Sequence, residues 1–282
     1  MNYEAWIGRE HRSTDRLGEG LAARWLATFD LPHPARGIMP QGIHFALCTP
    51  QAPTANLGED GHPARDDSPD SFLPPFPMPR RMWASSKITF HAPITVGAAI
   101  AQTARVASVS EKAGGSGRLA FVDVSRETFA HGALAVTETQ TLVYREAAGA
   151  DAPLSPPPLG EARFDPSEWG AHRVLSPDPR LLLRYSALTF NTHRIHYDAP
   201  YAQSVERYRG LVVHGPLTAS LLLQLAASEL GENALRSFAF RGLSPAIAGE
   251  PLHLVMRKGE AGYDLAAFAD DGRQVTQASA SV

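Results

Sequence analysis

This sequence of 282 residues has little cysteine, little net charge and no long apolar run. Its single cysteine, Cys48, excludes an internal disulfide framework and a cysteine-rich metal site. The net charge of −3 argues against a nucleic-acid-binding protein, which would carry a basic excess. The most apolar run, 217–227, is shorter than the ~18 residues of a membrane-spanning helix. An acid at Glu4, with no apolar stretch after it, is untypical of a signal peptide. We therefore expect a soluble, cytoplasmic protein without a nucleic-acid or membrane partner.

The length and the distribution of proline predict two domains. At roughly 150 residues per domain, the chain is long enough for two, and an apolar content of 44% can fill their cores. Prolines gather between residues 147 and 179, where they remove backbone donors and oppose regular structure. We predict an N-terminal domain of residues 1–146, a proline-rich linker of 147–179 and a C-terminal domain of 180–282. A second irregular stretch, 49–79, interrupts the first domain as a long excursion.

The two halves repeat one order of patterns, which favours an internal duplication. In each half an alternating strand leads into P-x-x-x-G, at Pro93–Gly97 and at Pro245–Gly249. Each half then ends in a hairpin turn and a last strand, with the turns at Gly132 and Gly272. The glycine-rich 112–118 lacks the Gly-Lys-Ser/Thr ending of a phosphate loop and is predicted to be a hairpin turn as well.

Each half also offers one helix ahead of its strands. The weaker pattern covers 17–29, and the stronger one, 217–227, is apolar on nearly all sides, which predicts a buried helix. Gly215-Pro216 suits the start of the second helix and Gly231 its end. A buried helix followed by antiparallel strands, found twice, predicts a sheet wrapped around a helix.

The densest group of polar residues lies between 185 and 198. It contains four groups that can carry or orient a proton: Asn191, His193, His196 and Asp198. Shortly after it, His214-Gly215 opens the predicted buried helix, whose first N–H groups would suit a developing oxyanion. Because histidine exchanges protons near neutral pH, the two segments together indicate proton transfer next to a polarised carbonyl.

The pattern N-x-H-x-I-H at 191–196, with H-G-P at 214–216, resembles the MaoC-like, hotdog-fold hydratases and dehydratases of acyl thioesters. That family's usual signature is D-x-N-P-x-H. The four matching positions here hold Asn191, His193, Arg194 and His196. This variant resembles the mitochondrial 3-hydroxyacyl-thioester dehydratases and the bacterial 3-methylfumaryl-CoA (mesaconyl-CoA) hydratases. Four segments of the first half favour the second branch: 72–75, 79–84, 90–91 and 116–122.

The resemblance implies an α+β double hotdog, in which two antiparallel sheets each wrap around a long central helix. Its one active site would lie in the C-terminal half and add water reversibly across the α,β double bond of an enoyl-CoA, with mesaconyl-CoA giving citramalyl-CoA. His196 would move the proton, Asn191 would hold the water, and the Gly215 N–H would bind the thioester carbonyl. An amide cannot act as a base, so His196 acts alone or with Asp198 or His193. No cofactor is implied, because the thioester is already an activated acceptor.

Several alternatives stay open at this point. CoA phosphates or a substrate carboxylate would need cationic or polar partners. The candidates for substrate binding are Arg184, Arg194, Arg241, His193 and His214. A dehydratase of longer acyl chains would instead have an apolar pocket, and a non-catalytic thioester-binding protein would explain the amide at position 191. A metal site at His193 and His196 is disfavoured, because no carboxylate has matching spacing. Hotdog sheets often pair edge to edge, which is consistent with a homodimer.

Overall fold

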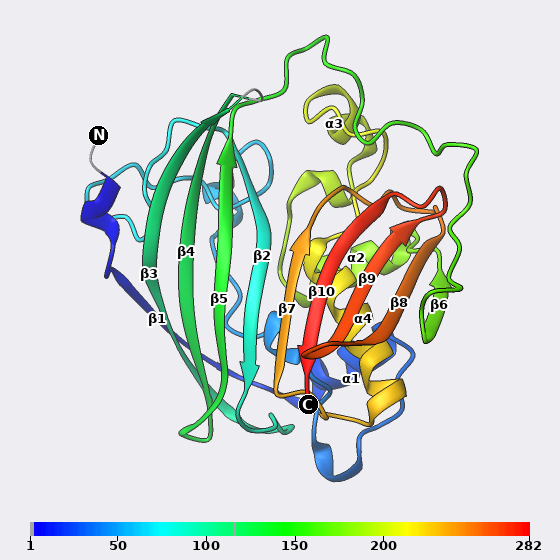
Figure 1. The fold of residues 1–282 in the computed structure, drawn as a ribbon. Coiled ribbons are helices and arrows are strands. Elements are labelled where there is room, and N and C mark those ends of the chain that lie inside the picture. The colour runs from blue at the N-terminus through cyan, green and yellow to red at the C-terminus, as the bar shows by residue number, and fades with distance from the viewer. Residues whose placement is uncertain (1–2, 115–116) are drawn as a thin grey trace.

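Ten strands form one continuous antiparallel sheet in the computed structural model, which describes residues 3–114 and 117–282 (Figure 1). Their order across the sheet is β1-β3-β4-β5-β2-β7-β10-β9-β8-β6. The strands of the first half are β1 (Glu10–Arg16), β2 (Arg80–Phe90), β3 (Ala99–Gly114), β4 (Gly117–Ala130) and β5 (Ala133–Arg145). Those of the second half are β6 (Ala171–Leu175), β7 (Ser237–Gly242), β8 (Leu252–Gly259), β9 (Gly262–Ala269) and β10 (Gln274–Ser281). The halves meet where β2 pairs with β7.

The predicted duplication is visible in the connections between strands. The P-x-x-x-G segments connect β2 to β3 and β7 to β8, and each glycine has a positive φ, +89° at Gly97 and +85° at Gly249. The hairpin turns at Gly132 and Gly272 connect β4 to β5 and β9 to β10, as predicted. The predicted hairpin turn of 112–118 falls between β3 and β4, with its residues 115 and 116 outside the described ranges.

The helices gather behind the C-terminal half of the sheet (Figure 1). They are α1 (Glu19–Thr28), α2 (Pro179–Leu188), α3 (Ala199–Ser204) and α4 (Gly215–Leu230). Within residues 3–114 and 117–282, five 3₁₀ turns accompany them: η1 (Tyr3–Trp6), η2 (Ala35–Gly37), η3 (Ile43–Ala46), η4 (Thr54–Asn56) and η5 (Arg194–His196). Helix α4 begins at Gly215, has Gly231 as its C-cap and buries every residue from 217 to 226 except Gln224, as its apolar sequence predicts. In the described ranges, no helix has the length and apolar character needed to cross a membrane.

The structure differs from the expectation of a long central helix in each half. In chain order α1 matches α2, and α4 has no counterpart in the first half. In that place the N-terminal half has the irregular stretch 49–79, whose prolines oppose a helix. Its Phe76 and Met78 pack on the sheet where a helix would otherwise lie, in a separate small core with Val122 and Tyr144. The two expected sheets are also joined into one.

The predicted linker is partly structured. Residues 171–175 form β6, which pairs with β8, and Pro179 begins α2. Residues 147–170 have no helix or strand and run beside the loop after α3, where Ser155 N–H donates to the Arg207 carbonyl. The domain boundaries themselves stay a prediction.

Candidate active site

Four histidine rings form a row that starts in the N-terminal half and ends at the start of α4. The ring centres of His62 and His193 are 4.1 Å apart, those of His193 and His196 5.5 Å, and those of His196 and His214 3.5 Å. His62 comes from the 49–79 stretch, His193 and His196 from the loop after α2, and His214 is the N-cap of α4. The structure thus brings together the three histidines that the sequence singled out and adds a fourth.

The chain between α2 and α3 is shaped by local hydrogen bonds. The Asn191 side-chain oxygen accepts from the His193 N–H at 2.9 Å, an Asx turn that leads into η5. The side-chain amide of Asn191 stays available, since only its oxygen takes part in the turn. His196 follows with its Nδ1 2.7 Å from the Val212 carbonyl. Because a carbonyl only accepts, Nδ1 carries the proton and Nε2 has a free lone pair.

Burial keeps the inner histidines neutral. Burial is the main cause that holds the pKa of His196 well below its ordinary value. Burial likewise lowers the pKa of His214 to about 3, and Nε2 of His214 lies 2.9 Å from the Ser186 hydroxyl. A neutral His196 with a bare Nε2 is a base ready to accept a proton.

The start of α4 lies at the boundary between the two halves. Its first N–H groups have no partner within the helix and, with the helix dipole, favour negative charge near Gly215. The Trp83 carbonyl of β2 lies 3.9 Å from where a Cβ on Gly215 would be. Strand β2 therefore passes beside this helix start, and a substrate carbonyl bound at Gly215 would contact both halves.

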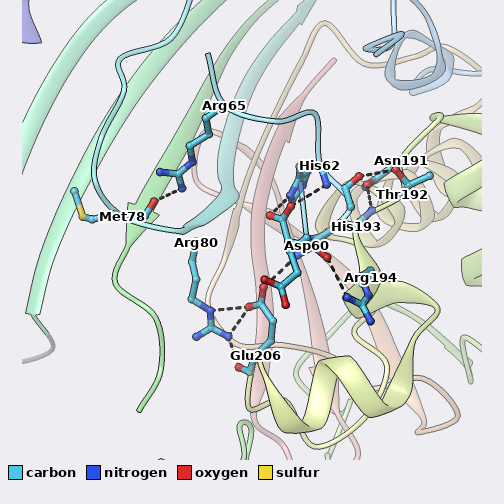
Figure 2. Close-up of polar contacts among 12 residues, drawn as sticks. Asp60, His62, Arg65, Met78, Arg80, Asn191, Thr192, His193, Arg194 and Glu206 are labelled. Carbon is cyan, nitrogen blue, oxygen red and sulfur yellow. Dashed lines mark hydrogen bonds and ion pairs between the residues drawn. The ribbon is translucent and has the colours of Figure 1, made fainter. Parts of the chain in front are cut away.

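The 49–79 stretch is held against the loop that contains His193 (Figure 2). The Arg194 N–H donates to the Asp60 carbonyl at 2.8 Å, and the Thr192 hydroxyl donates to the Gly61 carbonyl at 2.5 Å. Gly61 has a φ of +87°, and a Cβ there would lie 1.9 Å from the Thr192 carbonyl oxygen. Only glycine fits at this contact, which places Asp60 and His62 beside the candidate active-site residues of the other half.

Sequence reasoning missed three titratable groups that the structure places here. His62 Nδ1 lies 2.9 Å from an Asp60 carboxylate oxygen, and Glu206 lies 3.4 Å from His193 Nε2 (Figure 2). Burial opposes ionisation of both acids. Hydrogen bonds from His62 nevertheless lower the pKa of Asp60, and His193 and Arg80 together lower that of Glu206. The only hint in the sequence was a D-G-H triplet inside an irregular stretch, and nothing in it indicates which loop it contacts.

The same residues are the ones that could hold a metal ion. Ligand atoms of Asp60, His62 and His193 all lie within 4.8 Å of one another, and imidazole with carboxylate is a donor set that zinc accepts. In the structure the Asp60 carboxylate is hydrogen-bonded to both Nδ1 and the N–H of His62. We therefore interpret the two residues as a hydrogen-bonded pair, and the absence of a metal requirement stays a prediction.

The other residues predicted from the sequence have different partners. Asp198 caps α3 and pairs with Arg194, whose guanidinium also lies 3.9 Å above the Tyr201 ring. Arg184 is exposed and donates to the Ala27 carbonyl, and Arg241 is exposed on β7. The structure thus gives Asp198 a capping role and leaves no contact between these arginines and the row of histidines. Two further arginines lie near the histidines: Arg80 pairs with Glu206, and the charge of Arg81 adds to the lowering of the pKa of His62, of which burial is the main cause.

Comparison with known proteins identifies the family and the fold of the chain. The model of the family "Hydroxyacyl-thioester dehydratase type 2" matches residues 42–248. The mesaconyl-C(4)-CoA hydratase of Chloroflexus aurantiacus is 39% identical over 99% of this chain and 97% of its own. A MaoC-like dehydratase structure from Phytophthora capsici covers the whole chain and 97% of its own, with a TM-score of 0.74 at 13% identity. A double-hotdog protein of Mycobacterium tuberculosis covers 97% of this chain and 95% of its own, with a TM-score of 0.58 at 15% identity.

These likenesses confirm the double-hotdog fold and the resemblance seen in the motifs. The protein is a hydro-lyase of the hydratase/dehydratase type that acts on acyl thioesters. Its chain belongs to the family of type 2 hydroxyacyl-thioester dehydratases.

Proposed function

We propose that the protein hydrates mesaconyl-C4-CoA (3-methylfumaryl-CoA) reversibly to citramalyl-CoA. The observation that carries this proposal is the free Nε2 of a buried, neutral His196 in the same site as the start of α4. The substrate follows from the relative from Chloroflexus aurantiacus, which is similar over nearly the full length of both chains.

In this reaction the thioester carbonyl would accept the Gly215 N–H, which withdraws electrons from the double bond. His196 would take a proton from water, and the hydroxide oxygen would bond to the β-carbon. The electrons of the double bond then move toward the thioester oxygen as an enolate, and a proton added to the α-carbon completes the hydration. Asn191 would position the water through its side-chain amide, since its oxygen is already used in the turn.

Arg81 is the cation that we propose for the free carboxylate of the substrate. In mesaconyl-C4-CoA this carboxylate is on the carbon that water attacks, so its partner must lie close to the histidines. Arg81 is half-buried on β2, two residues before Trp83, and its charge acts on His62. In the described ranges Arg81 forms no ion pair with a carboxylate, whereas Arg80 pairs with Glu206 and Arg194 with Asp198. A guanidinium without an acidic partner can bind a carboxylate through two hydrogen bonds.

A longer apolar acyl chain fits this site less well. The first half carries two ionisable groups opposite each other on β4 and β5, the half-buried Arg126 and the buried Glu138. Arg126 donates to the side chains of Gln102 and Gln140, and Glu138 accepts from Ser86. An apolar chain extended over this layer would have to cover polar groups, which costs free energy.

The first prediction concerns the reaction itself. Wild type should convert mesaconyl-C4-CoA to a product heavier by one water, and His196→Ala should lower kcat by about 10²–10⁴-fold, the usual contribution of a general base. The measurement is mass spectrometry of mesaconyl-C4-CoA, crotonyl-CoA and a medium-chain enoyl-CoA. Preference for the medium chain would indicate the longer-chain dehydratase. Binding of the thioesters without turnover would indicate a non-catalytic protein.

The second prediction concerns Arg81. Arg81→Gln should raise KM for mesaconyl-C4-CoA by about 10-fold or more and leave crotonyl-CoA, which has no free carboxylate, nearly unchanged, because a charge-assisted pair contributes about 1.5–3 kcal/mol. Arg12→Gln, the same change at an exposed arginine of β1, is the matched control. An equal change of KM for both substrates would exclude Arg81 as the carboxylate partner.

A further inference from the structure

The mechanism above leaves the pair of Asp60 and His62 without a function. MaoC-like enzymes have a carboxylate where this chain has Asn191, and Asp198, the nearest acid in that segment, is occupied by capping α3 and pairing with Arg194. Asp60 and His62 are brought into the same site from the other half of the chain, through the close contact of Gly61 with Thr192.

The hydrogen bonds of His62 fix its tautomer. An ionised Asp60 can only accept, so Nδ1 of His62, 2.9 Å away, carries the proton and Nε2 has the free lone pair. The His62 side chain is 22% exposed, against 9% for His193. Its ring is therefore more accessible to a small molecule than the neighbouring ring of the row.

The two histidines with a bare Nε2 differ in the charge that each can hold. Nδ1 of His196 faces a neutral carbonyl and its ring stacks on neutral His214, so an imidazolium there has no anion in contact. Nδ1 of His62 faces a carboxylate, which stabilises an imidazolium. A site with one neutral base and one histidine whose imidazolium would have an anion in contact offers a proton acceptor and, when that histidine is protonated, a proton donor.

We infer that Asp60 and His62 are the acid–base pair that replaces the missing carboxylate, with His62 as a second catalytic residue and Asp60 as its positioning residue. The inference rests on the proposed hydration. His196 takes a proton from water as the hydroxide bonds to the β-carbon, and the Nε2 proton of the His62 imidazolium goes to the α-carbon of the enolate. His196 is then protonated and His62 neutral. Release of one proton from His196 to water and uptake of one proton from water by His62 restore the starting state.

The charges around His62 give the pH dependence. Burial lowers the pKa of His62, Asp60 opposes that shift, and His193 and Arg81 add to it. Glu206 pairs with the neighbouring His193, and Arg80 pairs with Glu206. The active form has His62 protonated and His196 neutral, and it dominates between the pKa of His196 and that of His62. The alkaline limb of the rate profile therefore reports His62, and a substrate carboxylate held by Arg81 would extend that limb to higher pH.

The experiment compares the pH profiles of kcat for wild type, His62→Gln and Asp60→Asn with mesaconyl-C4-CoA as the substrate. We expect His62→Gln to lower kcat by about 10²-fold or more and to remove the alkaline limb. Asp60→Asn removes the anion that favours the imidazolium. We expect it to lower kcat by about 10-fold and to move the alkaline limb to lower pH, with a small change in KM. A loss of packing alone would lower activity at every pH without moving the limb.

Three controls make the result decisive. Glu59→Gln changes an exposed side chain of the same loop and should keep the wild-type profile. Long-range ¹H–¹⁵N NMR of the histidine rings should show His62 protonated at Nδ1 in the wild type and a mixture of tautomers in Asp60→Asn, whether or not the variant is active. Treatment of the wild type with EDTA should leave activity intact.

Two results would overturn the inference while leaving the hydratase function in place. One is wild-type kcat in His62→Gln, or an unmoved alkaline limb in Asp60→Asn, when His196→Ala is inactive. The other is loss of activity in EDTA with recovery on addition of zinc, which would make Asp60, His62 and His193 metal ligands. Absence of turnover in the wild type would contradict the hydratase function instead.

Discussion

At the scale of single residues, Gly61 is the position in the site where a larger side chain is least tolerated. Gly61→Ala would put a Cβ 1.9 Å from the Thr192 carbonyl oxygen at a φ of +87°, so the loop must move and lose its hydrogen bonds to Thr192 and Arg194. We expect kcat to fall by about 10-fold or more with a loss of about 1–3 kcal/mol in unfolding free energy. Steady-state kinetics and urea unfolding measure the two effects.

Gly149→Ala is the control for that substitution, because its Cβ meets nothing within 4 Å and its φ is ordinary. Wild-type kinetics in Gly61→Ala would show that the contact with Thr192 does not hold His62 in place. A loss of stability without a loss of kcat would place the role of Gly61 in folding alone.

The proximity of residues close together in sequence was predictable, and that of residues far apart in sequence was not. The spacing of Asn191, His193 and His196, followed by the start of a buried helix, was enough to expect that they meet near Gly215. Asp60 and His62 reach the same place through a loop without periodicity, and their contact depends on a glycine whose partner is 131 residues away. Substrate binding by Arg184, Arg194 and Arg241 stays a prediction, because proximity in sequence does not set the direction of a side chain. Arg184 points to α1, and Arg194 to α3.

At the scale of elements, helix α4 and the repeated strands were predicted correctly because each has a distinctive local sequence pattern. Apolar residues on all sides, with Gly215-Pro216 before and Gly231 after, define α4 almost to the residue. The P-x-x-x-G bends and hairpin glycines need backbone conformations that few other residues adopt, so they mark the same turns in both halves.

The N-terminal half was harder to predict because its one helix is not the central helix and an irregular loop covers part of its sheet. Helix α1 was expected to be the central helix, but it corresponds to α2 and packs against it. The 49–79 stretch covers part of the sheet with Phe76 and Met78 and carries Asp60 and His62 on the same excursion. The backbone groups of a helix in that place would be hydrogen-bonded within the helix. It could not pack against the loop of Thr192 and His193 as closely as Gly61 does.

At the scale of the whole molecule, the halves are held together by the junction of β2 and β7 and by a buried ion pair beside the active site. Arg80 begins β2 in one half, and Glu206 follows α3 in the other. Arg80 Nε donates to a Glu206 carboxylate oxygen at 2.6 Å, and the two side chains are only 8% and 9% exposed. The Tyr208 ring lies 5.4 Å from the guanidinium. Such a pair fixes how the halves meet, and Glu206 also contacts His193.

Glu206→Gln should therefore lower the unfolding free energy by more than the loss of an ordinary surface ion pair does. It leaves Arg80 buried without its anion, for which we expect a loss of about 3–5 kcal/mol in unfolding free energy at pH 7. Glu250→Gln, which breaks the more exposed pair with Arg209, should cost about 1 kcal/mol or less and serves as the control. Urea unfolding of both variants and the wild type measures the difference.

The pH dependence separates the ionic contribution from packing. Burial raises the pKa of Glu206, but His193 and Arg80 together bring it below the ordinary value of 4.5. The stability from this carboxylate is thus fully present above the pKa of the unfolded chain and is lost as the pH falls through the lower pKa of the folded one. The difference in unfolding free energy between wild type and Glu206→Gln should decrease over that acidic range and stay constant above it. An equal difference in unfolding free energy at acidic and neutral pH would show that Glu206 stabilises the contact of the two halves by packing and not by its charge.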